Sequence, residues 1–506
     1  MQRMRNVVQP TLLNQSESSN YRNIFKATSL FGGVQIYQIF IQVLRSKLIA
    51  VLIGPLGVGI IGLYTTALDV FKRITSLGLA QSAVRDISEA NGSGDTEKVC
   101  KVAAVIRKLV WITGFMGMAS VLLFSPLVSY ITFGNYEYII SFSILSIILL
   151  LDQLCAGQMV LLQGTRRLKD LAKSSAIGAT IGLLISVPIY FFLSIDGIVP
   201  ALLVTSVTSL LFTTHFSKKH QIKNNIISLK DAIKDGRPMI KMGIALCLSS
   251  VLVALNAYAI RGFIRFIDGA EVVGLFSAGA SITVTYVGLV FNAMSTDFYP
   301  RLASVSKDNI ECKRIVNQQG EIATLILAPL ILLCVIFMPV VIQVLYSDKF
   351  LPASNYVMYS VVGMMFKLPG WLSSIQFVAK GNARSFAKNE TFAGLYNLFI
   401  SVLGYKLGGL EGLGISSVIF NFIYAIHMYI LAKIHFDFSF NWSFIKVYFL
   451  QWLLIIISII LSLFSSELFR YLVGILLSII ITSFSIRQLT KCMGISLLSF
   501  VKRVHK

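Results

Sequence analysis

Nine lysine and arginine residues lie within, or at the ends of, apolar segments that are long enough to cross a lipid bilayer. They are Arg45, Lys47, Lys72, Arg73, Arg85, Arg261, Arg265, Lys367 and Lys406. A charge at the centre of a membrane helix costs roughly 2.5–3.5 kcal/mol on insertion scales, so such cations persist where they face protein or water. Arginine can hold a phosphate through two parallel hydrogen bonds, and lysine supplies a point charge. All except Lys406 are therefore candidate ligands for an anion such as a diphosphate headgroup.

Uncharged polar residues recur with helical spacing on the same segments. In the first segment Gln35, Gln38 and Gln42 precede Arg45 at intervals that keep all four on one narrow helix face. Two further stripes comprise Thr65, Asp69, Lys72 and Ser76, and then Ser277, Ser281, Thr285 and Asn292. We predict a water-filled cavity whose polar lining includes Gln35, Gln38, Gln42, Ser281, Thr285 and Asn292.

Three carboxylates within the predicted spans are candidates for exchanging a proton or a sodium ion: Asp69, Asp152 and Asp297. A plainer role remains open, because Asp69 stands one turn from Lys72 and Arg73 and is able to neutralise either of them. The cations near the span ends have a comparable alternative, which is to extend to the lipid headgroups: Arg45, Lys47 and Arg85.

The composition indicates an integral membrane protein. Of 506 residues, 56% are hydrophobic and 13% are charged, whereas about a quarter of the residues in soluble domains are charged. A spanning helix needs roughly 20 mostly apolar residues, and fourteen windows meet this requirement: 28–52, 58–82, 109–131, 138–163, 174–194, 197–216, 242–262, 272–296, 321–346, 355–379, 391–409, 413–434, 447–464 and 469–486. We expect an all-α polytopic membrane protein with about 14 transmembrane helices, arranged as two six-helix lobes around a central cavity plus two C-terminal helices.

The distribution of basic residues predicts the orientation, because cytoplasmic loops retain positive charge during insertion. Loops on one side, together with both termini, hold 33 Lys and Arg, and loops on the other side hold only Lys349 and Arg470. Both termini are therefore expected in the cytoplasm. The net charge of +21 is then mostly a signal of topology, and nucleic-acid binding is not expected. The scattered cysteines and the five unclustered histidines predict neither a metal site nor a catalytic cluster.

The two halves share a short motif at an offset of 215 residues, with Gly54-Pro-Leu-Gly-Val-Gly59 aligned to Gly269-Ala-Glu-Val-Val-Gly274. Each motif follows the first predicted helix of its half. This pattern indicates a duplicated six-helix unit with the substrate between two lobes, and chance matching of Gly and Val is the alternative. The predicted domains are an N-terminal lobe at 1–216, a cytoplasmic linker at 217–241, a C-terminal lobe at 242–436, and two extra helices with a basic tail at 437–506.

Two segments resemble the opening of Wzx-type O-antigen translocases: Lys47-Leu-Ile-Ala-Val-Leu-Ile-Gly-Pro-Leu-Gly-Val-Gly-Ile-Ile-Gly-Leu-Tyr64 and Ser76-Leu-Gly-Leu-Ala-Gln-Ser-Ala-Val-Arg85. Asp297-Phe-Tyr-Pro-Arg301 resembles the end of their eighth helix, and the similar helix pattern runs from about Tyr21 to Phe436. The resemblance implies the multidrug/oligosaccharidyl-lipid/polysaccharide exporter superfamily and the flipping of undecaprenyl-diphosphate-linked repeat units across the bacterial inner membrane. It also implies a cationic cargo cavity, to which only Lys47 and Arg85 carry over by motif.

On this interpretation the cargo is a lipid-linked oligosaccharide, O-antigen or another surface polysaccharide repeat unit, moved by alternating access. The candidate partners are membrane lipids, a polysaccharide polymerase and chain-length machinery. A lipid II flippase or a drug exporter of the same superfamily is the close alternative, and the surplus of cations argues against cationic drugs. From another class, the alternative is a membrane polymerase or glycosyltransferase. No large outer loop offers a catalytic site, so we expect a transporter without a resident cofactor.

Overall fold

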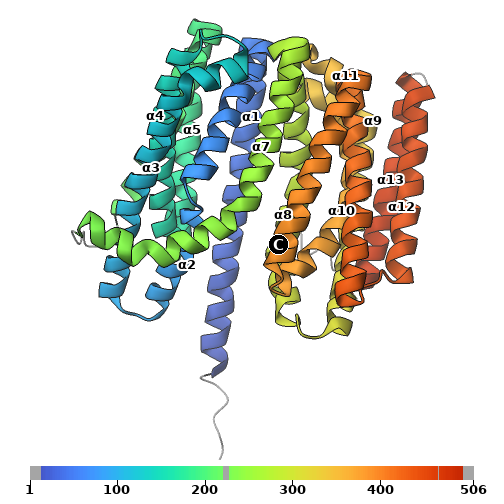
Figure 1. Cartoon of the computed structure of the whole chain (residues 1–506). Coiled ribbons are helices and arrows are strands. Elements are labelled where there is room, and N and C mark those ends of the chain that lie inside the picture. Colours follow the sequence, from blue (N-terminus) through green and yellow to red (C-terminus); the bar gives the residue numbers. More distant parts are fainter. Residues whose placement is uncertain (1–12, 220–226, 465–466, 494–506) are drawn as a thin grey trace, which may run out of the picture. The chain divides into compact units, whose positions relative to one another are not determined.

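The computed structural model describes residues 13–219, 227–464 and 467–493, and the side chains of the first helix from Tyr37 onward. Every regular element in these ranges is a helix, so the predicted all-α class is confirmed (Figure 1). The α-helices are α1 (Leu13–Thr75), α2 (Leu79–Gly92), α3 (Thr96–Phe133), α4 (Ile139–Gly164), α5 (Leu168–Leu193), α6 (Ile198–Lys218), α7 (Leu229–Ser281), α8 (Gly288–Ser304), α9 (Asn309–Leu345), α10 (Ser354–Ala379), α11 (Ala383–Phe436), α12 (Trp442–Phe464) and α13 (Glu467–Met493). The short elements are η1 (Ser194–Gly197), the π-helix η2 (Ile282–Val287) and η3 (Asp348–Ala353).

Ten helical segments in the described ranges are long and apolar enough to cross a bilayer. Three of them have more than 50 residues: Leu168–Lys218, Ser250–Ser304 and Arg384–Phe436. At 1.5 Å per residue a straight helix of that length would extend about 77–83 Å, against roughly 40–45 Å for a whole bilayer with its headgroups. These segments therefore have to turn back on themselves.

Contacts between distant residues of one segment show such reversals. In α11, Ser416 Oγ donates to the Ile400 carbonyl at 3.0 Å, although sixteen residues separate the two. The backbone leaves helical geometry between them, at residues 408–409. α5 and α6 pair on either side of η1, where a Cβ built on Gly182 would lie 2.9 Å from Thr208 Oγ1. The expected number of fourteen spans remains a prediction.

The chain divides into two compact units, each described here by itself. Unit 1 comprises Met1–Leu52, Leu68–Tyr130 and Asn135–Cys247. Unit 2 comprises Ile53–Ala67, Ile131–Gly134 and Leu248–Lys506. Two short segments of the first half thus belong to unit 2. The predicted domain boundaries at 216, 241 and 436 remain predictions.

The two glycine motifs of the sequence adopt the same backbone break, and both lie in unit 2. Gly54 interrupts α1 with φ 63° and ψ −169°, and Gly269 interrupts α7 with φ 84° and ψ −179°. Only glycine adopts this region without strain. Across the second break Arg261 Nε donates to Ser277 Oγ at 3.2 Å, which shows that α7 reverses at Gly269.

The glycines that close the two motifs make reciprocal backbone contacts. A Cβ built on Gly59 would lie 1.8 Å from the Ala270 carbonyl oxygen, and a Cβ on Gly274 would lie 1.8 Å from that of Pro55. Pro55 and Ala270 are themselves aligned at the offset of 215 residues. The two motifs therefore contact each other symmetrically, as two copies of one unit would. No side chain fits at either glycine without displacing the backbone.

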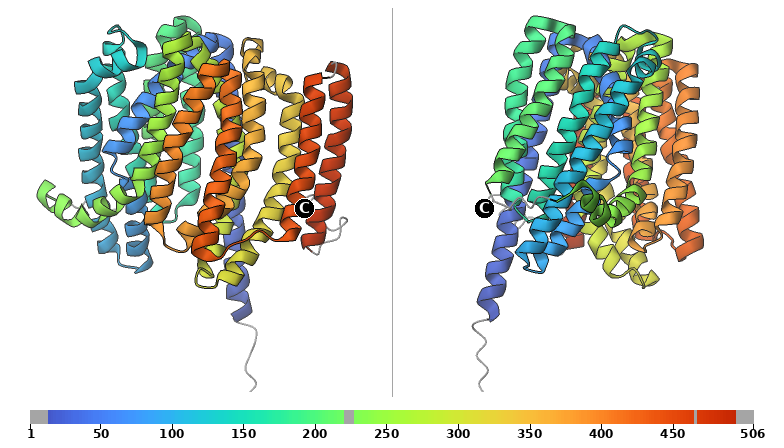
Figure 2. Two further views of the ribbon diagram at one scale, coloured as in Figure 1. Left: turned by 45° about the vertical axis from the view of Figure 1, so that its right-hand side comes forward. Right: turned by 60° about the vertical axis from the view of Figure 1, so that its left-hand side comes forward.

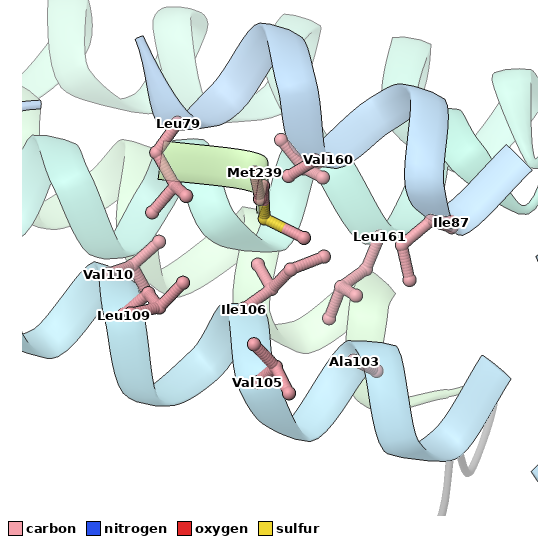
Figure 3. Packing of buried hydrophobic residues seen from close by; sticks show 11 residues of the cluster. Leu79, Ile87, Ala103, Val105, Ile106, Leu109, Val110, Val160, Leu161 and Met239 are labelled. Atoms are coloured by element: carbon pink, nitrogen blue, oxygen red, sulfur yellow. The ribbon is translucent and has the colours of Figure 1, made fainter. Parts of the chain in front are cut away.

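Unit 1 has a hydrophobic cluster that joins α2, α3, α4 and the start of α7 (Figure 3). Ile106 and Leu109 of α3 pack with Leu161 of α4, Leu79 of α2 and Met239 of α7, all nearly inaccessible to solvent. This packing fixes the first part of α7, within the predicted linker, against the helices of unit 1.

In unit 2, the last two helices pack side by side next to α9 (Figure 2). Gln451 Nε2 of α12 donates to Ser485 Oγ of α13 at 3.1 Å. Gly474 of α13 allows the approach of Ile336 of α9, since a Cβ there would lie 2.5 Å from Ile336 Cγ2.

Two element boundaries differ from those predicted. The window 58–82 runs past the end of α1 at Thr75, because Leu77 and Gly78 adopt positive φ angles of 51° and 61°. The predicted linker 217–241 contains the helical start of α7 from Leu229, and its residues 220–226 lie outside the described ranges.

We predict that Gly59→Ala and Gly274→Ala each destabilise the protein, because the added methyl group would overlap a backbone carbonyl. Overpacking of this kind costs about 1–3 kcal/mol. The measurement is the free energy of unfolding of each variant in detergent. Gly262→Ala is the matched control, since a Cβ there meets nothing within 4 Å. Equal stabilities of all three variants would contradict the contact.

Candidate functional site

Two of the predicted cargo cations in unit 1 are held by carboxylates. Lys72 Nζ lies 2.7 Å from Asp152 Oδ2, and Arg73 Nε lies 2.7 Å from Asp69 Oδ2. The partners are between about a quarter and two-fifths exposed, so these are partly solvated ion pairs. Each pair is neutral as a whole, and a phosphate would have to compete with the carboxylate for its base. The plainer role weighed for Asp69, neutralising Arg73, matches this geometry.

The remaining unit 1 cations have different surroundings. Arg45 of α1 lies beside the hydroxyl of Tyr190, a fully buried residue of α5. Lys47, one of the two residues carried over by resemblance, is half-buried on the same helix. Arg85 is exposed on α2 and donates from Nη1 to Met242 Sδ at 3.2 Å. α2 is too short to span a bilayer, so Arg85 does not lie in a transmembrane helix.

Arg261 of unit 2 is a cation within a span and has no carboxylate partner among the described residues. Eight residues separate it from the reversal at Gly269, which places it about 12 Å along the helix, near the middle of a core about 30 Å thick. Its Nε donates to Ser277, its Nη1 donates to the Ala257 carbonyl at 3.1 Å, and its guanidinium lies 5.0 Å from the Phe276 ring centroid. An arginine has five N–H donors, so three remain to bind an anion.

The other two unit 2 candidates occupy different depths. Arg265 is only four residues from Gly269, and its guanidinium packs against Gly134, where a Cβ would lie 2.6 Å from Nη1. Lys367 stands at the middle of the 26-residue helix α10, with Nζ 5.4 Å from the Phe291 ring centroid. Lys367 resembles Arg261 in depth and in having an aromatic neighbour.

Near Lys367 lies a buried polar group that sequence reasoning missed. Tyr424 donates its hydroxyl to Glu390 Oε1 at 2.5 Å, across the two legs of α11, and Glu390 interacts electrostatically with Lys367. The Tyr396 hydroxyl and His427 Nδ1 are buried in the same region without a hydrogen-bond partner among the described atoms. The predicted span 391–409 began one residue after Glu390. The available signal was an acid in the first turns of a long apolar helix.

The predicted polar lining is distributed unevenly. Gln35 lies outside the residues whose side chains are described, Gln38 is half-buried and Gln42 is exposed. Ser281 donates to the Ser277 carbonyl at 2.9 Å, whereas Thr285 and Asn292 are exposed. The π-helix η2 lies between Ser281 and Asn292, and one extra residue in a turn rotates the following side chains by roughly 100°. A regular spacing of 3.6 residues therefore does not describe this stripe.

Asp297, the third candidate for ion exchange, lies near the end of α8. Its Oδ2 is 3.0 Å from Arg301 Nε, one turn away, and Arg301 also donates to Gln319 Oε1 at 3.0 Å. The side chains of Asp297 and Arg301 are 77% and 50% exposed, so this is a surface ion pair. All three aspartates predicted for ion exchange thus have a base within 3.0 Å.

Comparison with known proteins identifies relatives of this chain. A model of the family described as "Polysaccharide biosynthesis protein" matches residues 24–306. The chain is 23% identical over 342 residues to a Shigella flexneri protein named "Putative O-antigen transporter", covering 65% of this chain and 78% of that protein.

Solved structures share the fold. The lipid II flippase MurJ in an inward closed conformation matches with a TM-score of 0.70 and 16% identity, covering 91% of this chain and 99% of that one. An inward-facing MATE family multidrug resistance transporter of the MOP superfamily matches with a TM-score of 0.67 and 15% identity, covering 80% and 94%. At these identities the likeness concerns the fold alone.

We predict that Lys72 and Asp152 stabilise each other by about 0.5–1 kcal/mol, as expected for a partly exposed ion pair. The measurement is a double-mutant cycle of unfolding free energies with Lys72→Gln and Asp152→Asn. The control cycle combines Asp152→Asn with Lys101→Gln, whose ion pair is with Asp235 at 2.9 Å. The control should be additive. Additivity in the test cycle as well would show that Lys72 is not held by Asp152.

Proposed function

Because this chain belongs to the polysaccharide biosynthesis protein family, we propose that it is a flippase for undecaprenyl-diphosphate-linked oligosaccharide. The family model covers residues 24–306, more than half of the 506. The chain is a multi-pass membrane protein with the fold of MOP-superfamily transporters. Its relatives are named as transporters and flippases, and none is named as an enzyme.

The observation that carries the choice of an anionic cargo is the environment of Arg261. A guanidinium at mid-membrane depth without a carboxylate is unfavourable unless an anion or water compensates its charge. Ser277, the Ala257 carbonyl and the Phe276 ring hold the side chain, and three of its N–H donors remain. A diphosphate matches this donor set, because planar guanidinium groups bind phosphate oxygens in pairs.

The proposed cycle is alternating access in the bacterial inner membrane, with both termini in the cytoplasm. Cargo enters from the cytoplasmic leaflet and leaves at the periplasmic leaflet, and the lipid tail remains in the bilayer throughout. The positive-inside distribution of Lys and Arg supports this orientation. Flipping needs no covalent chemistry, so the demand on the protein is to replace the water around the diphosphate with donors such as Arg261.

For ion coupling, the structure favours Glu390 over the three aspartates named from the sequence. Asp69, Asp152 and Asp297 each lie within 3.0 Å of a base. Glu390 is held instead by the Tyr424 hydroxyl, a neutral donor. Its charge also interacts with that of Lys367, so the gain or loss of a proton at Glu390 would change the charge balance at a candidate cargo cation. We therefore assign Glu390 as the coupling carboxylate.

Lipid II and drugs are the competing cargoes within the superfamily. A cationic drug would be repelled by Arg261, which has no ion pair with a described carboxylate, whereas lipid II offers the same diphosphate as the proposed cargo. The assay below therefore includes lipid II and a cationic drug as competitors. Transport of the drug, or exclusive transport of lipid II, would replace the proposed cargo.

We predict that Arg261→Gln reduces the rate of flipping in proteoliposomes by roughly tenfold to hundredfold. Hydrogen bonds to charged groups contribute about 1.5–3 kcal/mol, and each 1.4 kcal/mol is about tenfold. The measurement is the transfer of a fluorescent undecaprenyl-diphosphate oligosaccharide to the leaflet reached by an external quencher. Arg261→Lys should retain an intermediate rate.

Lys406→Gln is the matched control for Arg261. Lys406 is also a cation in an apolar helix, and its Nζ lies 5.9 Å from the Phe263 ring centroid. Its loss should change the rate less than twofold. Equal rates for wild type and Arg261→Gln, in protein that is equally well folded, would remove Arg261 from the cargo site.

We predict that Glu390→Gln abolishes the acceleration of flipping by an imposed proton or sodium gradient, while exchange without a gradient continues. The neutral amide can still accept the Tyr424 hydrogen bond but cannot exchange an ion. Asp297→Asn is the control and should keep full acceleration, since Asp297 is in a surface ion pair. Persistence of the gradient effect in Glu390→Gln would return the coupling role to another residue.

A further inference from the structure

A groove on unit 1 lies where α3 meets the start of α7. It has a volume of about 370 Å³, within the range of ligand sites, and it is lined by Lys108, Trp111, Ile112, Phe115 and Leu229. Four of these residues are hydrophobic and one is a cation. We refer to it as the α3–α7 groove.

The depth of the groove in the bilayer follows from the sequence of α3. Lys108 is the last charged residue of this helix, and residues 109–133 contain none. These 25 residues extend about 38 Å, enough to cross a hydrocarbon core about 30 Å thick. Lys108 therefore lies at the level of the headgroups, and Phe115, about 10 Å further along the helix, lies among the acyl chains.

The side chains of α3 that line the groove change from charged to apolar in the same order as a phospholipid does from its headgroup to its acyl chains. Lys108, Trp111 and Phe115 stand three and four residues apart, on one face of α3. The Trp111 and Phe115 rings stack at 5.4 Å, and both side chains are about half exposed. Tryptophan is enriched at the boundary between headgroups and acyl chains. A cation, an interfacial aromatic ring and an apolar ring thus follow one another from the headgroups toward the core.

The opposite wall is the start of α7, which is held in place by its contacts with α3. Leu229, its first residue, is exposed beside the groove. About two turns beyond Leu229, α7 is fixed to α3 by the ion pair of Asp235 with Lys101 at 2.9 Å, and by the contact of Gly236 with Leu109. A Cβ on Gly236 would lie 2.5 Å from Leu109 Cδ1. The groove is therefore formed between two helices that pack directly on each other.

The charges around the groove favour an anionic headgroup. Lys108 forms no ion pair with a described carboxylate, and Lys230 and Lys234 follow Leu229 on the first turns of α7. Of the acids on these turns, Asp235 is already paired with Lys101 and Asp231 accepts from the Ser228 hydroxyl at 2.7 Å. The local excess is positive. We propose that the α3–α7 groove binds an anionic phospholipid, with its phosphate at Lys108 and an acyl chain against Trp111, Phe115 and Leu229.

The test uses quenching of Trp111 fluorescence by lipids with brominated acyl chains in nanodiscs. The chain has four tryptophans, so Trp371, Trp442 and Trp452 are replaced by Phe to leave Trp111 as the single fluorophore. A second titration compares the wild-type chain with Trp111→Phe, and the difference between them gives the quenching of Trp111 with the other three tryptophans in place. Brominated phosphatidylglycerol should reach half-maximal quenching at a several-fold lower mole fraction than brominated phosphatidylcholine. Lys108→Gln should remove this difference.

Lys446→Gln in the same background is the control, because Lys446 is another cation beside an exposed aromatic position, with Nζ 5.5 Å from the Trp442 ring centroid in the unmodified chain. It should leave the preference at Trp111 unchanged. Equal quenching by the two lipids would mean that ordinary bilayer lipid occupies the groove, and an unchanged preference in Lys108→Gln would mean that Lys108 does not hold the headgroup. Either result overturns the proposal, and neither depends on what the protein transports.

Discussion

A charge within a bilayer needs a partner or water, and this requirement separates the ionisable residues of this protein into groups with different roles. Lys72 and Arg73 satisfy it with carboxylates 2.7 Å away, and they contribute to the fold. Arg265 lies close to the reversal at Gly269 and packs against the turn at Gly134. Arg261 alone of these four is both deep in a span and held only by neutral groups. Its charge is therefore the strongest reason to expect an anionic cargo.

The same requirement explains why aromatic rings accompany two deep cations that form no direct ion pair with a described carboxylate. Arg261 lies over Phe276 and Lys367 lies over Phe291, at 5.0 and 5.4 Å from the ring centroids. The face of an aromatic ring attracts a cation without neutralising it. Such a partner keeps the side chain in position while leaving its charge available to a ligand. A carboxylate in the same place would hold the cation more strongly and would also compete with a phosphate.

The sequence predicted what depends on composition and local pattern, and it missed what depends on how the helices fold back. The apolar windows predicted the helical class, and the motifs predicted the helix breaks at Gly54 and Gly269, at the second of which α7 reverses. The pairing of Glu390 with Tyr424 was not predictable, since the residues are 34 positions apart and meet only because α11 turns back. The π-helix η2 was missed as well, because nothing in its residues distinguishes it from regular helix. Arg85 was placed at the end of a span because the apolar window 58–82 continued past the turn at Leu77 and Gly78.

The reciprocal contact of Gly59 with Ala270 and of Gly274 with Pro55 has a consequence for ancestry. Residues related by the offset of 215 face each other across a local two-fold axis, as identical residues would in a symmetric homodimer. In such a dimer, any substitution near the axis would be present in both subunits, and the two copies of the new side chain would contact each other. A single chain that holds both motifs is free of that restriction, since the two positions can carry different residues, as residues 62 and 277 do. A Cβ on Gly62 would lie 3.4 Å from Ser277 Cβ, so the glycine at one position leaves room for the serine at the other, whose hydroxyl accepts a hydrogen bond from Arg261.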